Sequence, residues 1–198
     1  IILSALSVSI IYFSANLISA ILLASTIAFY FFVYTIWLKR KTPQNIVIGG
    51  ASGALPPVIG WAIATNSISL ESIAFFLIIF FWTPSHFWAL SLYKADDYKK
   101  AGIPMLPVTN GIQDTKKNIL IYSLLMIPTI VFPYYIGFVG EVFLTLSLLL
   151  TFYYNLICYQ LYNYKVGKFN IKKARHIFSY SIIYLFLIFV FFLVDKVL

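Results

Sequence analysis

Charged residues are scarce in this chain of 198 residues: 10% are Asp, Glu, Lys or Arg, whereas 62% are hydrophobic. A soluble domain carries roughly a quarter charged residues and is about half apolar. The composition therefore excludes an ordinary soluble protein. The apolar runs are long and unbroken, about 20 residues each, which is typical of membrane-spanning helices and not of alternating barrel strands. We expect an all-α, polytopic transmembrane helix bundle.

Cysteine and acidic residues are also rare. The single cysteine, Cys158, excludes a disulfide within the chain and argues against a thiolate metal site; its apolar surroundings predict a buried core residue. Six acidic residues stand against 14 basic ones, a net charge of +8. In a membrane protein such an excess marks cytoplasmic loops, so we expect no nucleic-acid partner.

Seven apolar segments follow one another along the chain. Their approximate ranges are 1–14, 16–37, 44–65, 70–92, 118–138, 141–163 and 176–194. The first is too short to span a bilayer at a rise of about 1.5 Å per residue. It begins at Ile1 without a methionine or a charged flank. We interpret the chain as a piece cut inside a transmembrane helix.

Basic residues occur in alternate loops. They are Lys39, Arg40 and Lys41 after the second segment, Lys94, Lys99, Lys100, Lys116 and Lys117 between the fourth and fifth, and Lys165, Lys168, Lys172, Lys173 and Arg175 between the sixth and seventh. The intervening loops carry none. The positive-inside rule therefore predicts that the three basic loops are cytoplasmic.

The stretch WTPSHFWALSLYKADDYKKAGIPMLPVTNG, residues 82–111, combines a membrane segment with the most polar loop. His86 lies about six residues before the membrane end, and an ionisable residue there is a functional candidate. The alternative is a histidine that is hydrogen-bonded to a neighbouring helix. Pro84 removes a backbone hydrogen bond and can open the helix locally.

Asp96 and Asp97 are adjacent, so on a helix they point about 100° apart. They could bind Mg²⁺ directly or through water, or divide between the metal and a basic partner. The flanking lysines Lys94, Lys99 and Lys100 could hold phosphate oxygens. The alternative is a solvated loop whose charges pair with one another. Two carboxylates are few for such a site; Glu71, Glu141 and Asp195 fall on the opposite side, which leaves Asp114 as a weaker candidate.

Residues 37–61 form a second unusual region. Thr42 and Pro43 predict a helix start, as N-cap and first helical residue. Small residues follow at Gly49, Gly50, Gly53 and Ala54, and we expect them to serve close helix packing. Pro56 and Pro57 should bend or break the helix in mid-membrane, which is tolerated only against protein or a cavity.

Two stretches, YTIWLKRKTPQNIVIGGASGALPPVIGW and WTPSHFWALSLYKADDYKKAGIPMLP, together closely resemble the protoheme IX farnesyltransferase family, the haem O synthases of the UbiA prenyltransferase superfamily. The resemblance covers the whole chain in order, although the last three helices match mainly by hydropathy. It implies nine transmembrane helices around a lipid-open cavity. It also implies two aspartate-rich cytoplasmic loops that hold Mg²⁺ and farnesyl diphosphate.

The family's second aspartate motif maps onto Asp96 and Asp97. The superfamily pattern D-x-x-x-D is incomplete, because Tyr93 stands four residues before Asp97. The first motif, N-D-x-x-D-x-x-x-D, has no counterpart. The resemblance therefore implies a single transmembrane prenyltransferase domain over residues 1–198 that lacks the first two helices. The family's histidine before Phe-Trp maps onto His86, and its basic pair onto Lys39 and Arg40.

The implied reaction is transfer of a farnesyl group to a vinyl group of haem B, with water completing a hydroxyethylfarnesyl product, haem O. The catalytic residues would be His86, Asp96 and Asp97, both aspartates on the metal, and the substrate-binding residues would be Lys39, Arg40, Lys94, Lys99 and Tyr98. The implied setting is a bacterial inner membrane, with membrane lipid around a multi-pass chain and a haem A synthase acting downstream.

Other interpretations stay open. The chain could be a catalytically incomplete fragment or half of a split enzyme. It could instead be a UbiA-type enzyme with an aromatic quinone precursor as acceptor. A multi-pass transporter would explain the hydropathy but not the loop that mixes acidic and basic residues.

Overall fold

The computed structural model describes residues 2–164 and 170–197, and every regular element within them is helical. The elements are α1 (Ile2–Ser14), α2 (Leu17–Ala28), the π-helix η1 (Phe29–Leu38), α3 (Asn45–Ala54), α4 (Pro56–Thr65), α5 (Leu70–Tyr93), α6 (Ala95–Lys100), α7 (Leu106–Thr109), α8 (Gly111–Tyr135), α9 (Glu141–Tyr162) and α10 (Ile171–Val197). Six spans are long and apolar enough to cross a membrane: α2–η1, α3–α4, α5, α8, α9 and α10. The predicted all-α, multi-pass bundle is confirmed.

Each of the seven predicted segments corresponds to a helix, with α1 as the short one. Two helices begin more than a turn earlier than predicted. Helix α8 begins at Gly111 rather than 118, and α10 at Ile171 rather than 176. Both extra turns are polar, because a helix can continue past the apolar region once its side chains reach water. The short helices α6 and α7 lie in what hydropathy identifies only as a loop.

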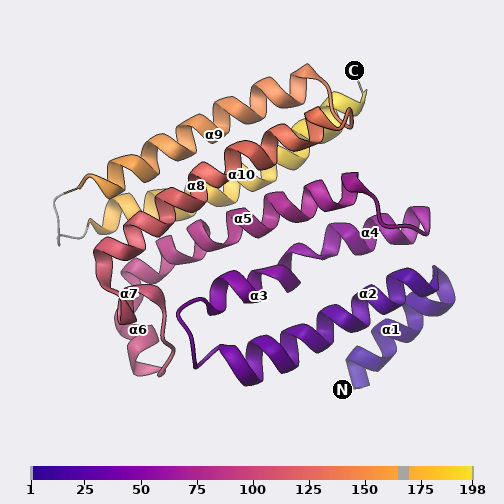
Figure 1. Cartoon of the computed structure of the whole chain (residues 1–198), viewed down its shortest axis with the longest axis horizontal. Helices are drawn as coiled ribbons and strands as arrows, with labels where there is room; N and C mark the ends of the chain where they lie inside the picture. The colour runs from indigo at the N-terminus through magenta and orange to yellow at the C-terminus, as the bar shows by residue number, and fades with distance from the viewer. Residues whose placement is uncertain (1, 165–169, 198) are drawn as a thin grey trace.

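The helices lie side by side across the molecule. Helix α5 contacts α8 and α10 on one side and α3 on the other, while α1 and α2 form the outer edge (Figure 1). The connection 39–44, the α6–α7 region, the end of α9 and the start of α10 all lie at one end of the bundle (Figure 1). The alternate basic loops therefore share one side, as predicted, although Lys165 and Lys168 lie outside the described residues. Which side is cytoplasmic stays a prediction.

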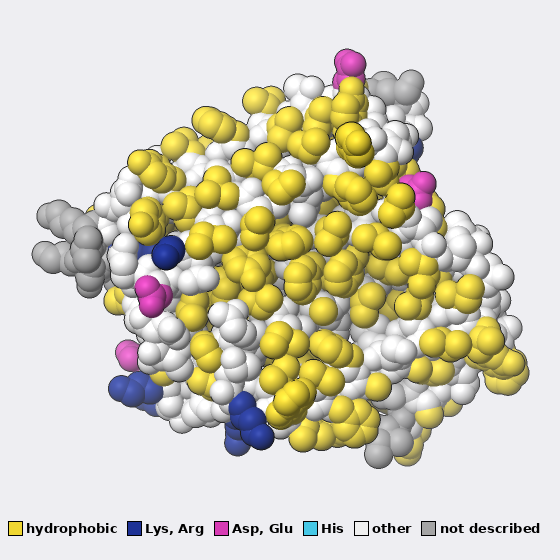
Figure 2. Space-filling view, viewed as in Figure 1, with side chains coloured by type: hydrophobic (Ala, Val, Ile, Leu, Met, Phe, Trp, Pro, Cys, Tyr) yellow, Lys and Arg dark blue, Asp and Glu magenta, His cyan; other side chains and the backbone are white. Residues whose placement is uncertain are grey.

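The surface agrees with this arrangement. Figure 2 shows a face whose middle is covered by hydrophobic side chains, with charged side chains at its two ends. Glu71 and Glu141 lie in the first turns of α5 and α9, and Asp195 lies near the end of α10, all at the end away from the basic loops. The predicted separation of these acidic residues from Asp96 and Asp97 is thus confirmed.

The proline pair breaks its helix as predicted. Helix α3 ends at Ala54, and α4 begins at Pro56. The predicted start at Thr42 and Pro43 is wrong, because α3 begins at Asn45. The Asn45 amide donates hydrogen bonds to the carbonyl oxygens of Thr42 (2.8 Å) and Lys39 (3.3 Å). This side chain stabilises a turn through Thr42 and Pro43, which delays the helix.

Pro84 does not open α5, which runs without interruption from Leu70 to Tyr93. Pro84 is buried in the middle of the bundle. Helices α3, α8 and α10 pack against α5 and support the continuous helix. The local opening expected there is absent from the described structure.

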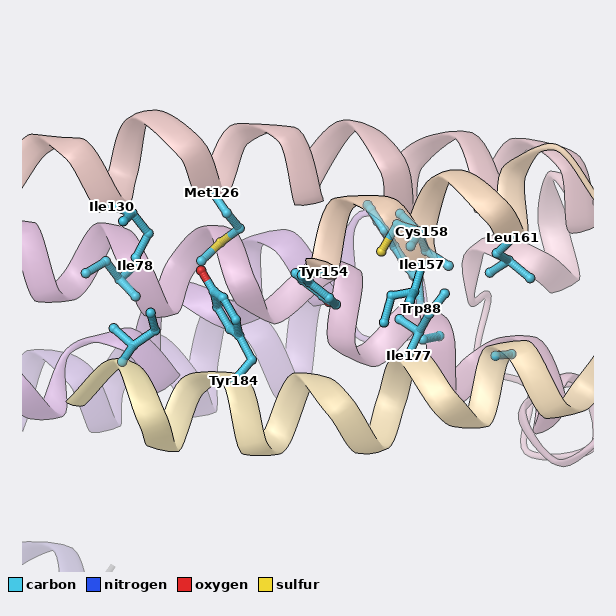
Figure 3. Close-up of a cluster of buried hydrophobic side chains, with 14 of the residues drawn as sticks. Ile78, Trp88, Met126, Ile130, Tyr154, Ile157, Cys158, Leu161, Ile177 and Tyr184 are labelled. Atoms are coloured by element: carbon cyan, nitrogen blue, oxygen red, sulfur yellow. The ribbon is translucent and has the colours of Figure 1, made fainter. Parts of the chain in front are cut away.

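The core lies between α5, α8, α9 and α10. Figure 3 shows Ile78, Met126, Ile130 and Tyr184 directed toward one another from three of these helices. Cys158 is fully buried there, as predicted. Hydrogen bonds between helices pair some of the polar groups in this core: the Tyr184 hydroxyl lies 2.9 Å from Thr151 Oγ1. This four-helix core fixes the position of α5, which carries the candidate histidine.

Candidate active site

The two aspartates of the polar loop lie in the first turn of α6, and both are exposed. The Lys94 ammonium contacts Asp97 Oδ2 at 3.0 Å. The charge pairing expected for a solvated loop is thus present for Asp97. No group of three or more His, Cys, Asp or Glu side chains that could hold a metal occurs among the described residues. Asp114 is exposed in the first turn of α8 and completes no such group.

The predicted substrate-binding cations lie at the same end of the bundle. Lys99 is exposed in the last turn of α6, and Lys39 and Arg40 directly follow η1. Lys39 is half-buried, and its backbone N–H donates to the Tyr34 carbonyl at 2.8 Å. These side chains are positioned where an anionic group could approach from water.

Tyr98 of α6 lies partly inside the bundle. It is half-buried, and its phenol is near enough to Tyr34 of η1 to interact with it electrostatically. Burial raises the pKa of Tyr98 above its ordinary value; Tyr93 raises it further, and the charge of Lys94 opposes the rise. Tyr98 therefore stays a neutral hydrogen-bond donor at physiological pH, suited to a phosphate oxygen.

A cavity of about 640 Å³ lies between α2, η1, α3 and α5. Its aromatic lining comprises Tyr30, Phe31, Tyr34, Trp82 and Phe87. Three glycines of α3 form another part of the lining: Gly49, Gly50 and Gly53. Tyr34, which lines the cavity, also lies near Tyr98 of α6.

Some small residues of α3 allow close packing, and others leave room for the cavity. A Cβ at Gly49 would lie 2.4 Å from Tyr34 Cδ2, so Tyr34 packs directly on this glycine. A Cβ at Gly50 would lie 3.0 Å from Thr83 Cγ2 of α5. A Cβ at Gly53 would meet nothing within 4 Å. The predicted packing role holds for the first two, while Gly53 contributes to the open cavity.

His86 is buried on α5 and faces α10. Its Nδ1 lies 2.6 Å from Ser181 Oγ, so the alternative of a hydrogen bond to a neighbouring helix is what the structure contains. No hydrogen bond joins His86 to Asp96 or Asp97 in the described part of the chain. The structure thus gathers Asp96, Asp97 and the cations at one end, with His86 deeper in the bundle.

Three residues near the site were not predicted from the sequence as site residues. The Arg175 guanidinium lies 5.5 Å from the centre of the Tyr93 ring. The buried Lys116 ammonium donates to the Tyr164 carbonyl at 2.8 Å. Ser181 contacts His86. Their sequence surroundings carry no motif, since the last three helices are distinguished only by hydropathy.

Comparison with known proteins identifies the family. The model of the UbiA prenyltransferase family matches residues 1–183. The chain belongs to the UbiA prenyltransferase family. Proteins of this family generally use Mg²⁺ with diphosphate substrates. No solved structure matches the chain.

Several curated UbiA relatives share one name, protoheme IX farnesyltransferase. The chain is 72% identical over 196 residues to that of Pelagibacter ubique, an alignment that covers 99% of this chain and 65% of the relative. It is 50% identical to those of Parvibaculum lavamentivorans and Azorhizobium caulinodans, covering 92% and 94% of this chain but 58% and 61% of the relatives. The chain thus spans about three fifths of the length of these relatives.

Proposed function

We propose that the protein acts in transfer of a farnesyl group from farnesyl diphosphate to a vinyl group of haem B, giving haem O. The observation that carries the proposal is an aromatic cavity of about 640 Å³ whose lining residue Tyr34 lies near Tyr98 of α6, the helix that bears the aspartates and lysines. Such a cavity suits an apolar isoprenoid, and the polar end suits its diphosphate. The names of the relatives specify the donor group and the acceptor.

The aspartate pair fits magnesium by its chemistry. Mg²⁺ takes hard carboxylate oxygens, usually one or two, and keeps waters and substrate phosphates as its other ligands. Asp96 and Asp97 are exposed, which leaves room for those ligands. Asp97 would exchange its contact with Lys94 for the metal. Bound there with the diphosphate, Mg²⁺ would neutralise the charge that develops on the leaving group.

The side chains around the pair would divide the remaining work. Lys94 and Lys99, together with Arg40 from the neighbouring loop, would bind diphosphate or propionate oxygens. Tyr98 would donate a hydrogen bond to a phosphate oxygen. The aromatic walls would hold the farnesyl chain and exclude water from the allylic cation. The faces of the aromatic rings would stabilise the positive charge of this cation. The basic, polar end would face the cytoplasm of a bacterial cell, where these substrates are met.

The first test replaces Asp97 by Ala in membranes that contain the protein and are supplied with farnesyl diphosphate, haem B and Mg²⁺. We expect haem O formation to fall at least about 100-fold, because a charge-stabilising ligand is lost. The Lys94–Asp97 pair is exposed and contributes little to folding, about 0–1 kcal/mol, so stability should be retained. Chromatography of extracted haems measures the product.

Asp114→Ala is the matched control, since Asp114 is an exposed aspartate at the same end of the bundle. It should leave product formation within about twofold of the wild type. Full activity of the Asp97 variant would overturn the assignment. Prenylation of an aromatic acid in place of haem B would instead support a quinone-precursor acceptor.

A further inference from the structure

The imidazole of His86 is held in one plane by two aromatic rings. Trp82 stacks on one face, with ring centres 4.3 Å apart and planes inclined by 18°. Phe178 of α10 stacks on the other, at 4.6 Å and 23°. Trp82 also donates its indole N–H to the Ser181 carbonyl at 2.8 Å, which fixes α5 against α10. His86 is 7% exposed and Ser181 is fully buried.

The contacts of Ser181 assign the protons. Its Oγ lies 2.6 Å from His86 Nδ1 and also 2.6 Å from the Phe178 carbonyl oxygen. A serine hydroxyl has one proton, and a carbonyl oxygen can only accept. Ser181 therefore donates to Phe178 and accepts from His86, so Nδ1 carries the imidazole proton. In a neutral imidazole the lone pair is then on Nε2.

Nε2 has no hydrogen-bond partner among the described residues. Unlike the unpartnered Trp88 Nε1 and Ser147 Oγ, which are fully buried, His86 Nε2 is not fully buried. This nitrogen therefore keeps some accessible surface. The geometry is that of a fixed ring with one occupied nitrogen and one open, basic nitrogen.

We propose that Ser181 is a positioning residue that holds His86 in the Nδ1-protonated tautomer and leaves Nε2 as a proton acceptor. The acceptor role rests on the proposed function. There, the C–O bond of farnesyl diphosphate breaks with its electron pair leaving on diphosphate. The terminal vinyl carbon of haem bonds to the farnesyl carbon. Water adds to the other vinyl carbon and loses one proton, which Nε2 accepts.

The chain offers a direct measurement, because it contains only two histidines. Protein labelled with ¹⁵N-histidine in lipid bilayers is studied by solid-state NMR, and His176→Gln assigns the His86 signals. We expect a protonated Nδ1 and an unprotonated Nε2 in the wild type. In Ser181→Ala the acceptor is gone, so the proton should move wholly or partly to Nε2. Ser179→Ala, which removes an exposed hydroxyl from the same helix, should change nothing.

An Nε2-protonated His86 in the wild type would overturn the proposal, as would an unchanged tautomer in Ser181→Ala. The wild-type spectrum decides even if the variant does not fold. Haem O formation is measured separately, and Ser181→Ala should lower kcat about 10-fold or more with little change in KM. A wild type with the expected tautomer but no haem O would refute the proposed function and leave the assigned tautomer standing.

Discussion

Gly49 and Gly53 lie four residues apart on α3, yet they face different surroundings. Gly49 supports the ring of Tyr34, whereas Gly53 faces open cavity. The sequence predicts small residues at this spacing, but it cannot tell contact from empty space. That distinction depends on η1, which positions Tyr34. The sequence of α3 itself does not show where η1 places this ring.

Adding a methyl group should separate the two glycines. Gly49→Ala forces a Cβ to within 2.4 Å of the Tyr34 ring, so the ring must move. We expect a loss of about 1–3 kcal/mol in the free energy of unfolding, the usual effect of overpacking. Gly53→Ala meets nothing within 4 Å and should be neutral or stabilising by up to about 1 kcal/mol. Unfolding in mixed micelles measures both, and equal losses would contradict the packing.

A large side chain at Gly53 tests the cavity itself. Gly53→Phe should enter the cavity without displacing backbone and occupy part of its volume of about 640 Å³. We expect the KM for farnesyl diphosphate to rise at least about 10-fold, with stability retained. Gly60→Phe is the control, because Gly60 of α4 is equally unobstructed and does not line the cavity. An unchanged KM in the Gly53 variant would place the isoprenoid elsewhere.

The candidate site was predictable from sequence in its residue types, and less so in its contacts. Asp96, Asp97 and their lysines are recognisable because polar residues stand out against apolar segments. The partner of His86 is not recognisable, because Ser181 lies 95 positions away in a helix with no motif. Only tertiary packing brings the two together.

At the scale of elements, helix ends are where local signals succeed or fail. Pro56 and Pro57 break a helix by their own chemistry, so the break was predictable. Helix α9 begins after Gly140, which has no side chain to cap it. Its cap comes from α10: Asp195 Oδ2 accepts from the Gly140 N–H at 2.7 Å, and Oδ1 accepts from the Phe143 N–H at 3.1 Å. No local pattern predicts a cap from another helix.

Removing this cap should loosen the contact between α9 and α10. Asp195→Ala leaves two backbone N–H groups without their carboxylate, and we expect a loss of about 1–2 kcal/mol in unfolding free energy. Glu141→Gln removes a charge from an exposed side chain in the same turn and should cost less than about 1 kcal/mol. Thermal unfolding in detergent compares the two. Equal effects would show that net charge, and not the cap, stabilises this end.

The π-helix η1 is the element that the sequence indicates least. Its wider hydrogen bonding reaches five residues back, as in the bond from the Lys39 N–H to the Tyr34 carbonyl at 2.8 Å. The run Phe29–Leu38 has the hydropathy of any membrane helix, so period and composition do not reveal it. π-helical turns often occur at functional sites, and this one supplies three aromatic side chains of the cavity.

For the whole molecule, the placement of charge was the most predictable property. The number of apolar helices follows from the long apolar runs, and the shared end of the basic loops follows from basic residues in alternate loops. The bilayer enforces both patterns directly. The order of packing does not follow, because every face of an apolar helix is acceptable to lipid. The central position of α5 therefore emerges only from its contacts with α3, α8 and α10.

The predicted orientation can be tested with introduced cysteines. Cys158 is fully buried and should not react, so the native chain serves as the background. We expect a membrane-impermeant maleimide added outside intact spheroplasts to label Ser67→Cys. It should not label Lys41→Cys or Ala101→Cys until the membrane is permeabilised. These three positions are exposed at opposite ends of the bundle. The reverse pattern would place the aspartate helix outside the cytoplasm.

The contacts between α5 and α10 can form only after α10 has been synthesised. His86 and Trp82 leave the ribosome well before Ser181, which lies 95 positions after His86. At a synthesis rate of about 5–20 residues per second, these groups wait about 5–20 s for their partner. In the most apolar stretch of α2–η1 11% of the residues are buried, against 50% in that of α5. Until α10 is inserted, His86 and the Trp82 indole therefore lack the Ser181 contacts that they have in the finished bundle.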